Sequence, residues 1–371
     1  MKINFLNGNL IIRKNKSGVH FFHENIMRGL IKNGINLKTS FFNFTNKNTL
    51  LLEEKENNWI KDNIIQNKYL PRILTYILPI EFFFGKSDIY ICDGWIPITI
   101  CKSKKIAIVH DLMSKIYPEN YSLIMKLYLS LFFVQVKKAD RIIAVSDTTK
   151  KDIIKYLNIS ANKIDVVYNG VNLKYIKSIE SDKSRININL NRKYILYIGE
   201  MRKNKNLISA IKAFELYCSI NDDKCYFYIA GKKSYEYENI INYIKNKPIK
   251  NRIIFLGYIS EKEKIKLYKN SFAFIFISLY EGFGIPILEA MACKTPVITS
   301  DCSSMKEIAD GSALLVSPTN INEICKMIEK LNDERFRKNI IKLGNLCVKK
   351  YQWKDSVSKF EKILIKTKDI F

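Results

Sequence analysis

The stretch SLYEGFGIPILEAMACKTPVITSD occupies residues 278–301 and follows an apolar run that is typical of a buried strand. Gly282 and Gly284 allow the backbone to approach a ligand closely, because glycine has no Cβ. Pro286 suits the first turn of a helix. A strand, a glycine loop and a helix N-terminus in this order can bind an anion such as a phosphate. The stretch therefore predicts a βα unit with an anion site.

Two glutamates flank this glycine loop. Glu281 precedes it and Glu289 lies in the opening turns of the predicted helix, so their carboxylates can reach one ligand from different sides. Ionised carboxylates only accept hydrogen bonds, and the hydroxyls of a sugar or a ribose are suitable donors. The alternative is that Glu289 complements the helix dipole and Glu281 is solvated. Two glutamates around one glycine-proline loop favour ligand binding over this alternative.

Outward from this stretch, short apolar runs alternate with helical patterns in both halves of the chain. The expected strands are residues 2–6, 89–92, 106–109, 142–145, 194–198, 226–230, 253–256, 273–277 and 297–299. Runs of this length and composition are typical of buried parallel strands. A helical pattern over residues 19–32 ends at Asn33 and Gly34. The sequence therefore predicts an α/β protein with two doubly wound parallel sheets.

The length of 371 residues predicts two domains, because one hydrophobic core rarely serves more than about 250–300 residues. We expect an N-terminal domain over residues 1–175, a C-terminal domain over residues 190–350 and a final helical segment over residues 351–371. The polar stretch 174–193 separates the two series of strands and helices and is the expected linker. Two domains would offer a cleft between them for a ligand.

The chain is strongly basic, with 61 Lys and Arg against 36 Asp and Glu and a formal net charge of +25. This charge would favour nucleic acid, an anionic membrane or phosphate-bearing substrates. The lysines are scattered, however, and a composition generally rich in Lys, Asn and Ile explains the charge equally well. The eight cysteines form no C-x-x-C pair and no cluster with zinc spacing, so we expect reduced thiols.

The N-terminal residues 1–18 lack the continuous apolar region of a signal peptide, which predicts a cytoplasmic protein. Two apolar stretches, residues 69–84 and 124–136, fall short of the about 20 residues needed to span a bilayer. Both are rich in aromatic residues and have basic neighbours, so contact with a membrane surface stays open. Packing in the core is the favoured interpretation of both stretches.

Residues 281–292 read EGFGIPILEAMA and resemble the signature of glycosyltransferase family 4, an E-x7-E pair inside E-G-F-G-x-P-x-L-E-A-M-A. Residues 145–146, 169–171, 195–214 and 229–231 also look like landmarks of that family, so the resemblance covers nearly the whole chain. It implies a GT-B fold, in which two Rossmann-like domains face a cleft. The nucleotide then lies mainly on the C-terminal domain, and the final helix crosses back to the first domain.

The resemblance also implies a retaining transferase that uses a nucleotide-diphosphate sugar. Glu289 would bind the ribose, and Glu281 would hold the donor sugar. Lys205, beside a predicted helix start, matches the family's phosphate ligand. Where the family often has an arginine after Gly199 this chain has Glu200, so Arg202 is the expected substitute. The other expected donor-binding residues are Gly18, Gly282, Phe283, Gly284 and Ile285.

The three histidines all lie in the first half of the chain. His110 and Asp111 directly follow a predicted strand, where α/β sheets bind ligands, and the resemblance implies that they face the donor sugar or the acceptor. His20 and His23 are spaced for a metal but show no third ligand in the sequence, and the edge of an amphipathic helix explains them. No D-x-D motif is present to bridge a diphosphate through a cation. We therefore expect neither a metal nor a cofactor.

The family resemblance implies a function in bacterial surface-polysaccharide synthesis, of the O-antigen or capsule type. The expected reaction moves a hexose, with mannose as the first choice, to a lipid-linked or glycan acceptor at the inner face of the plasma membrane. One alternative is a nucleotide-sugar epimerase or hydrolase of the same fold. Another is a basic protein that binds nucleic acid or anionic lipid, which the scattered lysines disfavour.

Overall fold

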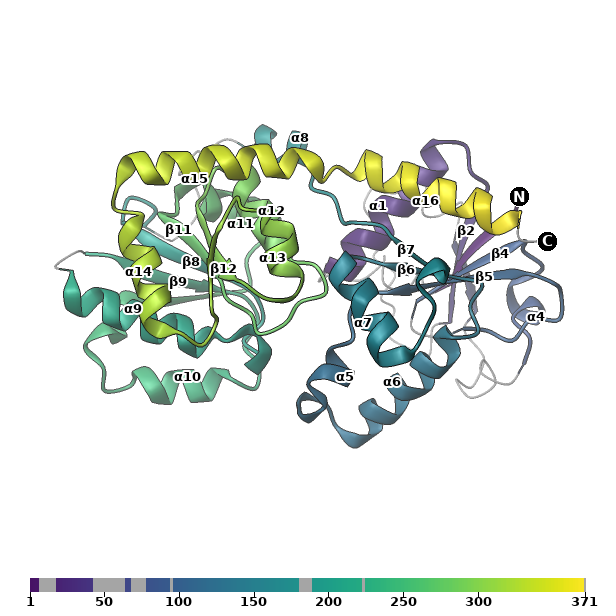
Figure 1. The fold of residues 1–371 in the computed structure, drawn as a ribbon, viewed down its shortest axis with the longest axis horizontal. Coiled ribbons are helices and arrows are strands. Elements are labelled where there is room, and N and C mark those ends of the chain that lie inside the picture. Colours follow the sequence, from purple (N-terminus) through teal and green to yellow (C-terminus); the bar gives the residue numbers. More distant parts are fainter. Residues whose placement is uncertain are drawn as a thin grey trace. The chain divides into compact units, whose positions relative to one another are not determined.

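The structure is a computed structural model that describes residues 1–6, 18–42, 64–67, 78–93, 96–179, 189–221 and 224–369. The chain forms two compact units (Figure 1). Unit 1 comprises Met1–Gly170 together with Trp353–Phe371, and unit 2 comprises Val171–Gln352. The linker expected over residues 174–193 lies partly outside the described residues, and its first part forms the helix α8 (Leu173–Ser178).

Unit 1 contains a parallel sheet with the order β3-β2-β1-β4-β5-β6-β7 among its described strands. The strands are β1 (Ile3–Leu6), β2 (Leu37–Phe42), β3 (Ile64–Asn67), β4 (Ile89–Cys92), β5 (Lys104–Val109), β6 (Arg141–Ala144) and β7 (Ile164–Val166). The order reverses between β1 and β4. Ligands of doubly wound sheets bind outside the carboxyl ends of the strands at such a reversal.

The described helices of unit 1 include one from the far end of the chain. They are α1 (Gly18–Lys32), α4 (Glu81–Phe84), α5 (Met113–Ile116), α6 (Leu123–Val136), α7 (Asp147–Leu157) and α16 (Trp353–Lys368). The apolar face of α1 is fully buried at Phe22, Ile26 and Leu30. Helix α16 packs along α1 (Figure 1), which confirms that the C-terminal helix returns to the first domain.

Close packing of α16 on α1 depends on Gly29. A Cβ at this position would lie 2.3 Å from Cγ2 of Val357. Gly29→Ala should therefore lower the free energy of unfolding by about 1–2 kcal/mol, because overpacking outweighs the better helix propensity of alanine. Thermal or urea unfolding measures this loss. In a Val357→Ala background the same change should be neutral or stabilising, and an equal loss in both backgrounds would contradict the proposed contact.

Unit 2 contains a parallel sheet with the order β10-β9-β8-β11-β12-β13 among its described strands. The strands are β8 (Tyr194–Ile198), β9 (Tyr226–Ala230), β10 (Ile253–Gly257), β11 (Ala273–Phe276), β12 (Val297–Ser300) and β13 (Leu314–Val316). The further helices are α9 (Leu207–Ile220), α10 (Tyr237–Ile244), α11 (Glu261–Asn270), α12 (Ile285–Ala292), α13 (Ser303–Ala309), α14 (Ile321–Lys330) and α15 (Glu334–Cys347). The order reverses between β8 and β11.

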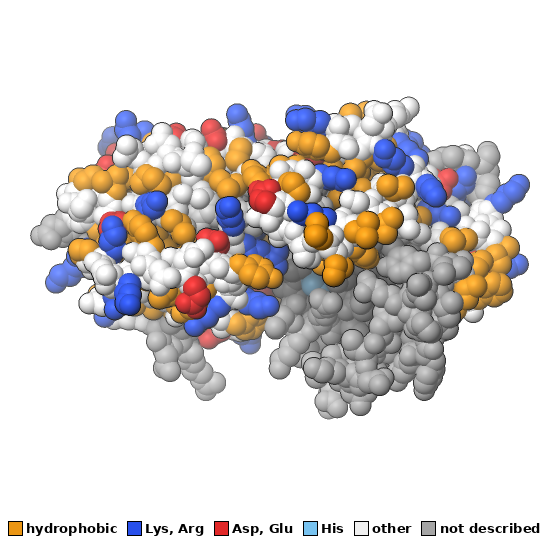
Figure 2. All heavy atoms as spheres, turned by 90° about the horizontal axis from the view of Figure 1, so that it is seen from below, with side chains coloured by type: hydrophobic (Ala, Val, Ile, Leu, Met, Phe, Trp, Pro, Cys, Tyr) orange, Lys and Arg blue, Asp and Glu red, His pale blue; other side chains and the backbone are white. Residues whose placement is uncertain are grey.

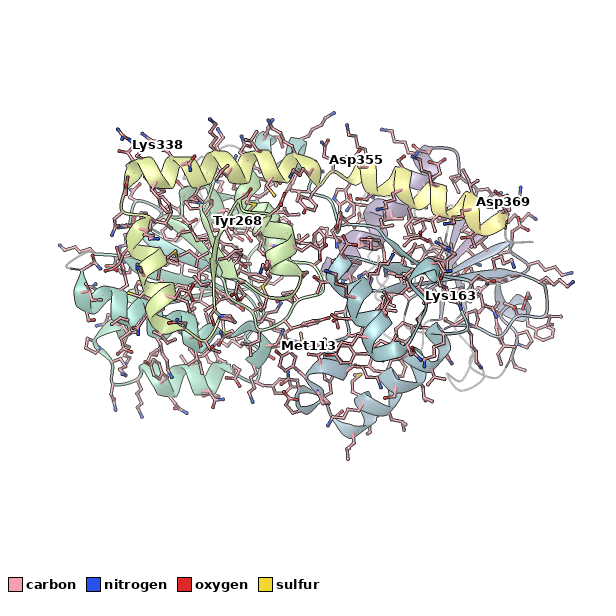
Figure 3. The ribbon with its side chains drawn as sticks, viewed as in Figure 1. Met113, Lys163, Tyr268, Lys338, Asp355 and Asp369 are labelled. Carbon is pink, nitrogen blue, oxygen red and sulfur yellow. The ribbon has the colours of Figure 1, made fainter. Side chains whose placement is uncertain are left out.

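Two side chains of unit 2 illustrate which positions of its helices are buried and which are exposed. Tyr268 of α11 lies inside the unit and is fully buried, whereas Lys338 projects outward from α15 (Figure 3). Tyr194 and Tyr228 stack in neighbouring strands with their ring centroids 4.3 Å apart. Aromatic residues of the expected strands thus form part of the core of this unit.

All nine expected strands are confirmed, with ends that differ by at most two residues. Four strands were not expected, namely β2, β3, β7 and β13. In β2 the buried polar residues Thr39 and Ser40 interrupt the apolar pattern. The strands β7 and β13 are only three residues long, too short for a recognisable period.

Core packing is confirmed for part of residues 124–136 and is wrong for the exposed apolar residues of that stretch. In α6 only Phe132, Phe133 and Val136 are buried. Residues on its other faces are exposed apolar side chains, namely Leu123, Ile124, Met125, Leu127, Leu131 and Val134. Among the described residues, no helix has both the length and the apolar character to cross a membrane.

Candidate functional site

Two residues selected from the sequence meet at the carboxyl edge of the sheet in unit 2. Lys205 ends a short 3-10 turn (Lys203–Lys205) that follows β8, and Glu281 lies in the loop that follows β11. The Lys205 Nζ lies 2.5 Å from Oε1 of Glu281. Leu279 N–H donates to the carbonyl of Asn204 at 2.7 Å, which joins the two loops. This pair lies where the strand order reverses, the place that favours ligand binding.

The glycine loop beside this pair is held by α13. Gly284 has φ +118°, a conformation that other residues rarely adopt, and precedes the first residue of α12. The Ser304 Oγ lies 2.8 Å from the carbonyl oxygen of Glu281 and 2.7 Å from that of Phe283, so its one proton can be donated to either. The loop therefore presents the N-terminus of α12 in a fixed position, with Gly282 and Ile285 partly exposed. Backbone N–H groups at such an end can bind a phosphate.

Lys205 and Glu281 are both largely buried, with side chains 20% and 15% exposed. The ammonium group of Lys205 also lies 5.2 Å from the centre of the Phe276 ring, within reach of a cation–π attraction. Because these groups are partly withdrawn from water, each gains from a partner of opposite charge. An entering anion would compete with Glu281 for Lys205.

Glu289 has a different set of partners. Its Oε1 lies 2.6 Å from Nζ of Lys264, and Tyr268 donates its hydroxyl to Oε2 at 3.4 Å. Burial raises the pKa of Glu289, although Lys264 acts in the opposite direction. Burial also disfavours the charged form of Lys264, but attraction to Glu289 and Glu261 raises the pKa of this lysine overall. The result is a buried ion pair next to the glycine loop.

Lys264 and Tyr268 were not predicted as site residues. They lie four residues apart on α11 and therefore on one face of that helix. This spacing was the only indication in the sequence that the two residues act together. It does not predict that this face of α11 turns toward Glu289.

Arg202 lies in the loop of Lys205, but its guanidinium pairs with Glu200 at 2.8 Å. The Arg202 side chain is 53% exposed. Glu200 occupies the position where the family often has an arginine. It pairs with Arg202, the residue expected to substitute for that arginine. A phosphate could attract Arg202 only in competition with Glu200.

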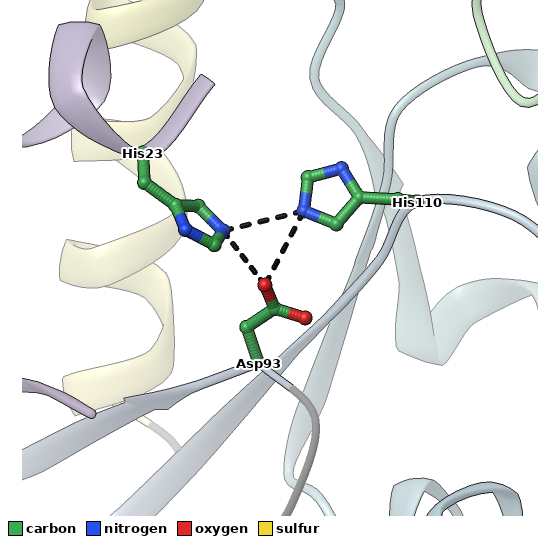
Figure 4. Close-up of side chains that lie close together, drawn as sticks. All are labelled: His23, Asp93 and His110. Carbon is green, nitrogen blue, oxygen red and sulfur yellow. Dashed lines mark hydrogen bonds and ion pairs between the residues drawn. The ribbon is translucent and has the colours of Figure 1, made fainter. Parts of the chain in front are cut away.

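Three polar residues converge at the carboxyl edge of the other sheet, in unit 1 (Figure 4). His23 lies on α1, Asp93 follows β4 and His110 follows β5. Oδ2 of Asp93 lies 3.0 Å from Nε2 of His23 and 3.6 Å from Nε2 of His110. The two imidazole Nε2 atoms are 3.2 Å apart. We call these three residues the His-Asp-His triangle.

His23 is buried, Asp93 and His110 are partly buried, and both histidine rings pack against aromatic rings. The His23 ring lies 4.9 Å from that of Phe5, and the His110 ring lies 5.4 Å from that of Phe22, both edge-on. Burial alone would raise the pKa of Asp93, but its contacts with the two histidines hold the pKa well below its usual range. Burial lowers the pKa of His23 despite the neighbouring carboxylate.

Unit 1 contains three further residues that the sequence analysis considered, namely Gly18, His20 and Asp111. Gly18 begins α1, and the serine before it lies outside the described residues. Oδ1 of Asp111 accepts a hydrogen bond from the N–H of Met113 at 2.9 Å and so helps to begin α5. His20 is buried on α1.

The sequence shows no third ligand beside His23, whereas the structure brings both Asp93 and His110 to it. Asp93 directly follows an expected strand, as His110 does. That shared position was the signal, because β4 and β5 are neighbours in the sheet and their ends meet. The sequence did not reveal that α1 contributes to the same place.

Comparisons with known proteins agree with this organisation. The model of glycosyl transferases group 1 matches residues 178–347, and that of glycosyltransferase family 4 matches residues 19–175. The O-antigen chain mannosyltransferase RfbU of Salmonella typhimurium is 31% identical over 261 residues, 69% of either chain. An N-acetylgalactosamine-N,N'-diacetylbacillosaminyl-diphospho-undecaprenol 4-alpha-N-acetylgalactosaminyltransferase of Campylobacter jejuni is 29% identical over 58% of this chain and 57% of its own.

Among solved structures, Anabaena Alr3699/HepE in complex with UDP and glucose has a TM-score of 0.76 and 16% identity, covering 99% of this chain and 100% of that one. This likeness confirms the fold, in which two Rossmann-like units follow each other. The chain is a glycosyltransferase of the retaining GT-B class, whose members generally use nucleotide-sugar donors without a required metal. It belongs to glycosyltransferase family 4.

Proposed function

We propose that the protein transfers a hexose, with mannose as the first choice, from a nucleotide-diphosphate sugar to a glycan or lipid-linked acceptor. The contact between Lys205 and Glu281 carries this proposal, because a lysine suited to phosphate and a glutamate suited to sugar hydroxyls meet at the carboxyl edge of one sheet. Mannose is supported by the Salmonella relative, whereas the Campylobacter relative is a 4-alpha-N-acetylgalactosaminyltransferase. The O-antigen in the name of the Salmonella relative supports a role in cell-surface polysaccharide synthesis.

The donor diphosphate would bind to Lys205 and to the N–H groups after Gly284. The incoming phosphate replaces Glu281 as the partner of Lys205, and the released carboxylate can accept hydrogen bonds from the donor sugar. As the bond to the sugar breaks, negative charge grows on the leaving phosphate, and the ammonium group of Lys205 and the backbone N–H groups stabilise it. Arg202 would assist once it leaves Glu200. Gly282, Phe283 and Ile285 complete the loop around the phosphates.

Retention of configuration arises either from a double displacement through a covalent intermediate or from attack of the acceptor on the face that the phosphate leaves. We propose front-face attack assisted by the leaving phosphate. Glu289 would hold the ribose through a carboxylate oxygen, with Lys264 and Tyr268 fixing its position. Within unit 1, Gly18, His110 and Asp111 keep the roles implied by the family, namely closing over the diphosphate and orienting the sugar.

A peripheral position on the cytoplasmic face of the plasma membrane belongs to the same proposal. Its support is the exposed apolar surface of α6, which includes Leu123, Ile124 and Leu127. Lys137 and Lys138 follow this helix and are exposed, so anionic headgroups would have partners. On the face drawn in Figure 2, Lys and Arg side chains are scattered among uncharged and hydrophobic ones rather than gathered in one patch. That distribution fits nucleic acid poorly.

A thermal-shift screen against a panel of nucleotide sugars tests the donor site. A donor at about a hundred times its Kd adds about 2.7 kcal/mol to native stability and should raise the melting temperature by about 5 °C or more. Lys205→Ala should remove this shift. Lys203→Ala is the matched control, because Lys203 is an exposed lysine of the same turn. No shift with any donor, or equal shifts in the two variants, would count against the proposed site.

A further inference from the structure

The His-Asp-His triangle has the dimensions of a set of metal ligands. Its three ligand atoms are separated by 3.0, 3.2 and 3.6 Å. A point equidistant from them lies about 1.9 Å from each, and an ion slightly out of their plane would lie at the about 2.0–2.2 Å that zinc–nitrogen and zinc–oxygen bonds require. Figure 4 shows both imidazole Nε2 atoms and the carboxylate oxygen directed toward this common point.

The three atoms compete with one another for hydrogen bonds within the triangle. A carboxylate accepts only, and each neutral imidazole Nε2 carries at most one proton. A proton on His23 Nε2 can point at Asp93 or at His110, but not linearly at both. The 3.6 Å between Asp93 and His110 is too long for a good hydrogen bond. A cation at the common point would serve the three lone pairs together.

The three ligands come from separate elements that are already held by packing. Cys92 and Ala107 are partners in the register of β4 and β5, so Asp93 and His110 follow strands that lie side by side. His23 comes from α1, whose apolar face is buried. The side chains of Asp93 and His110 are 13% and 15% exposed, which leaves an approach for an ion from solvent. A preorganised set of this kind loses little entropy on binding.

We propose that the His-Asp-His triangle binds one divalent first-row transition-metal ion, for which Zn²⁺ is the probe. Two imidazoles and one carboxylate are ligands that such ions share, and three protein ligands leave coordination positions open for water or an oxygen ligand. This site lies in unit 1 and shares His110 with the proposed orientation of the donor sugar, but it shares no residue with the groups of unit 2 proposed for the diphosphate. Binding of the diphosphate thus stays metal-free. Zn²⁺ binding is measured without donor or acceptor, so its failure and that of the transferase proposal are distinguishable.

The test measures Zn²⁺ binding by untagged, full-length protein after treatment with a chelator. We expect one Zn²⁺ per chain and a higher melting temperature when it binds, because the folded state alone assembles the site. Asp93→Asn and His110→Gln should each weaken binding at least 100-fold, since each removes a ligand atom. Asp88→Asn is the matched control, because Asp88 is an exposed carboxylate that precedes the same strand β4. It should bind Zn²⁺ as the wild type does.

Competing explanations have distinct signatures. The chain has free cysteines that could capture zinc, so Co²⁺ is substituted and its absorption is recorded. Ligation by nitrogen and oxygen gives no thiolate charge-transfer band in the near ultraviolet. Such a band, no stoichiometric binding by the folded wild type, or equal binding by all variants would overturn the proposal. Melting of each metal-free variant checks its folding, and if Asp93→Asn fails to fold then His110→Gln decides the outcome.

Discussion

Glu281→Gln is expected to lower kcat about a thousandfold, the scale seen when one preorganised charged or polar group is removed from an active site. Positive charge develops on the sugar as the bond to phosphate breaks, and the carboxylate stabilises it, whereas an amide does so only weakly. Glutamine keeps the size of the side chain and an oxygen that can face Lys205. The melting temperature should therefore stay close to that of the wild type.

Steady-state kinetics with a donor identified by thermal shift measures this effect. Glu334→Gln serves as a control for charge alone, because Glu334 is exposed and pairs with Lys338 at 2.7 Å on α15. Turnover of the Glu281→Gln variant within tenfold of the wild type would remove Glu281 from its proposed role. A large fall in melting temperature would instead assign it a structural role.

Lys264→Met should lower the free energy of unfolding by about 3 kcal/mol, because removing one partner leaves a buried charge uncompensated. Glu289 then keeps only the hydroxyl of Tyr268 among the partners described for its carboxylate. Burial already raises the pKa of Glu289, and loss of Lys264 raises it further. The folded state thus binds a proton more tightly than the unfolded state, and stability falls as pH rises through the folded pKa. The penalty should be smaller in mild acid than at alkaline pH.

Urea unfolding at two pH values measures this penalty. The double variant Lys264→Met/Glu289→Gln should recover most of the lost stability, since no buried charge remains. Lys262→Met is the matched control on the exposed side of α11 and should stay within about 0.5 kcal/mol of the wild type. A double variant no more stable than Lys264→Met would show that the ion pair is not the cause.

Most of the fold could be predicted because both sheets are built from buried apolar runs, and such runs can be recognised from a few consecutive residues. Glu281 and Lys205 could also be selected as candidates from the sequence, since each lies in the loop after an expected strand. Lys264 and Asp93 could not, because their importance depends on contacts with Glu289 and His23 from other elements. Such partners are set by how α11 and α1 turn on their sheets, which no local period records.

The exposed residues of α6 likewise could not be predicted from the local sequence. A run such as residues 124–136 is apolar on every face, so its pattern does not say which face is buried. Only packing decides that Phe132, Phe133 and Val136 turn inward while Leu123 and Ile124 do not.

The return of α16 to unit 1 has a consequence for biosynthesis. The ribosome releases the first 170 residues long before Trp353–Phe371, yet α1 needs the late segment to cover it. Ser356 donates its hydroxyl to the carbonyl of Tyr168 at 2.7 Å. The end of the segment Met1–Gly170 therefore also lacks a contact until α16 has been synthesised. Unit 2 is complete first, and domains generally fold as units during synthesis. The chain therefore finishes its N-terminal unit last, and a nascent protein that stops before residue 353 would expose the apolar surface that α16 covers.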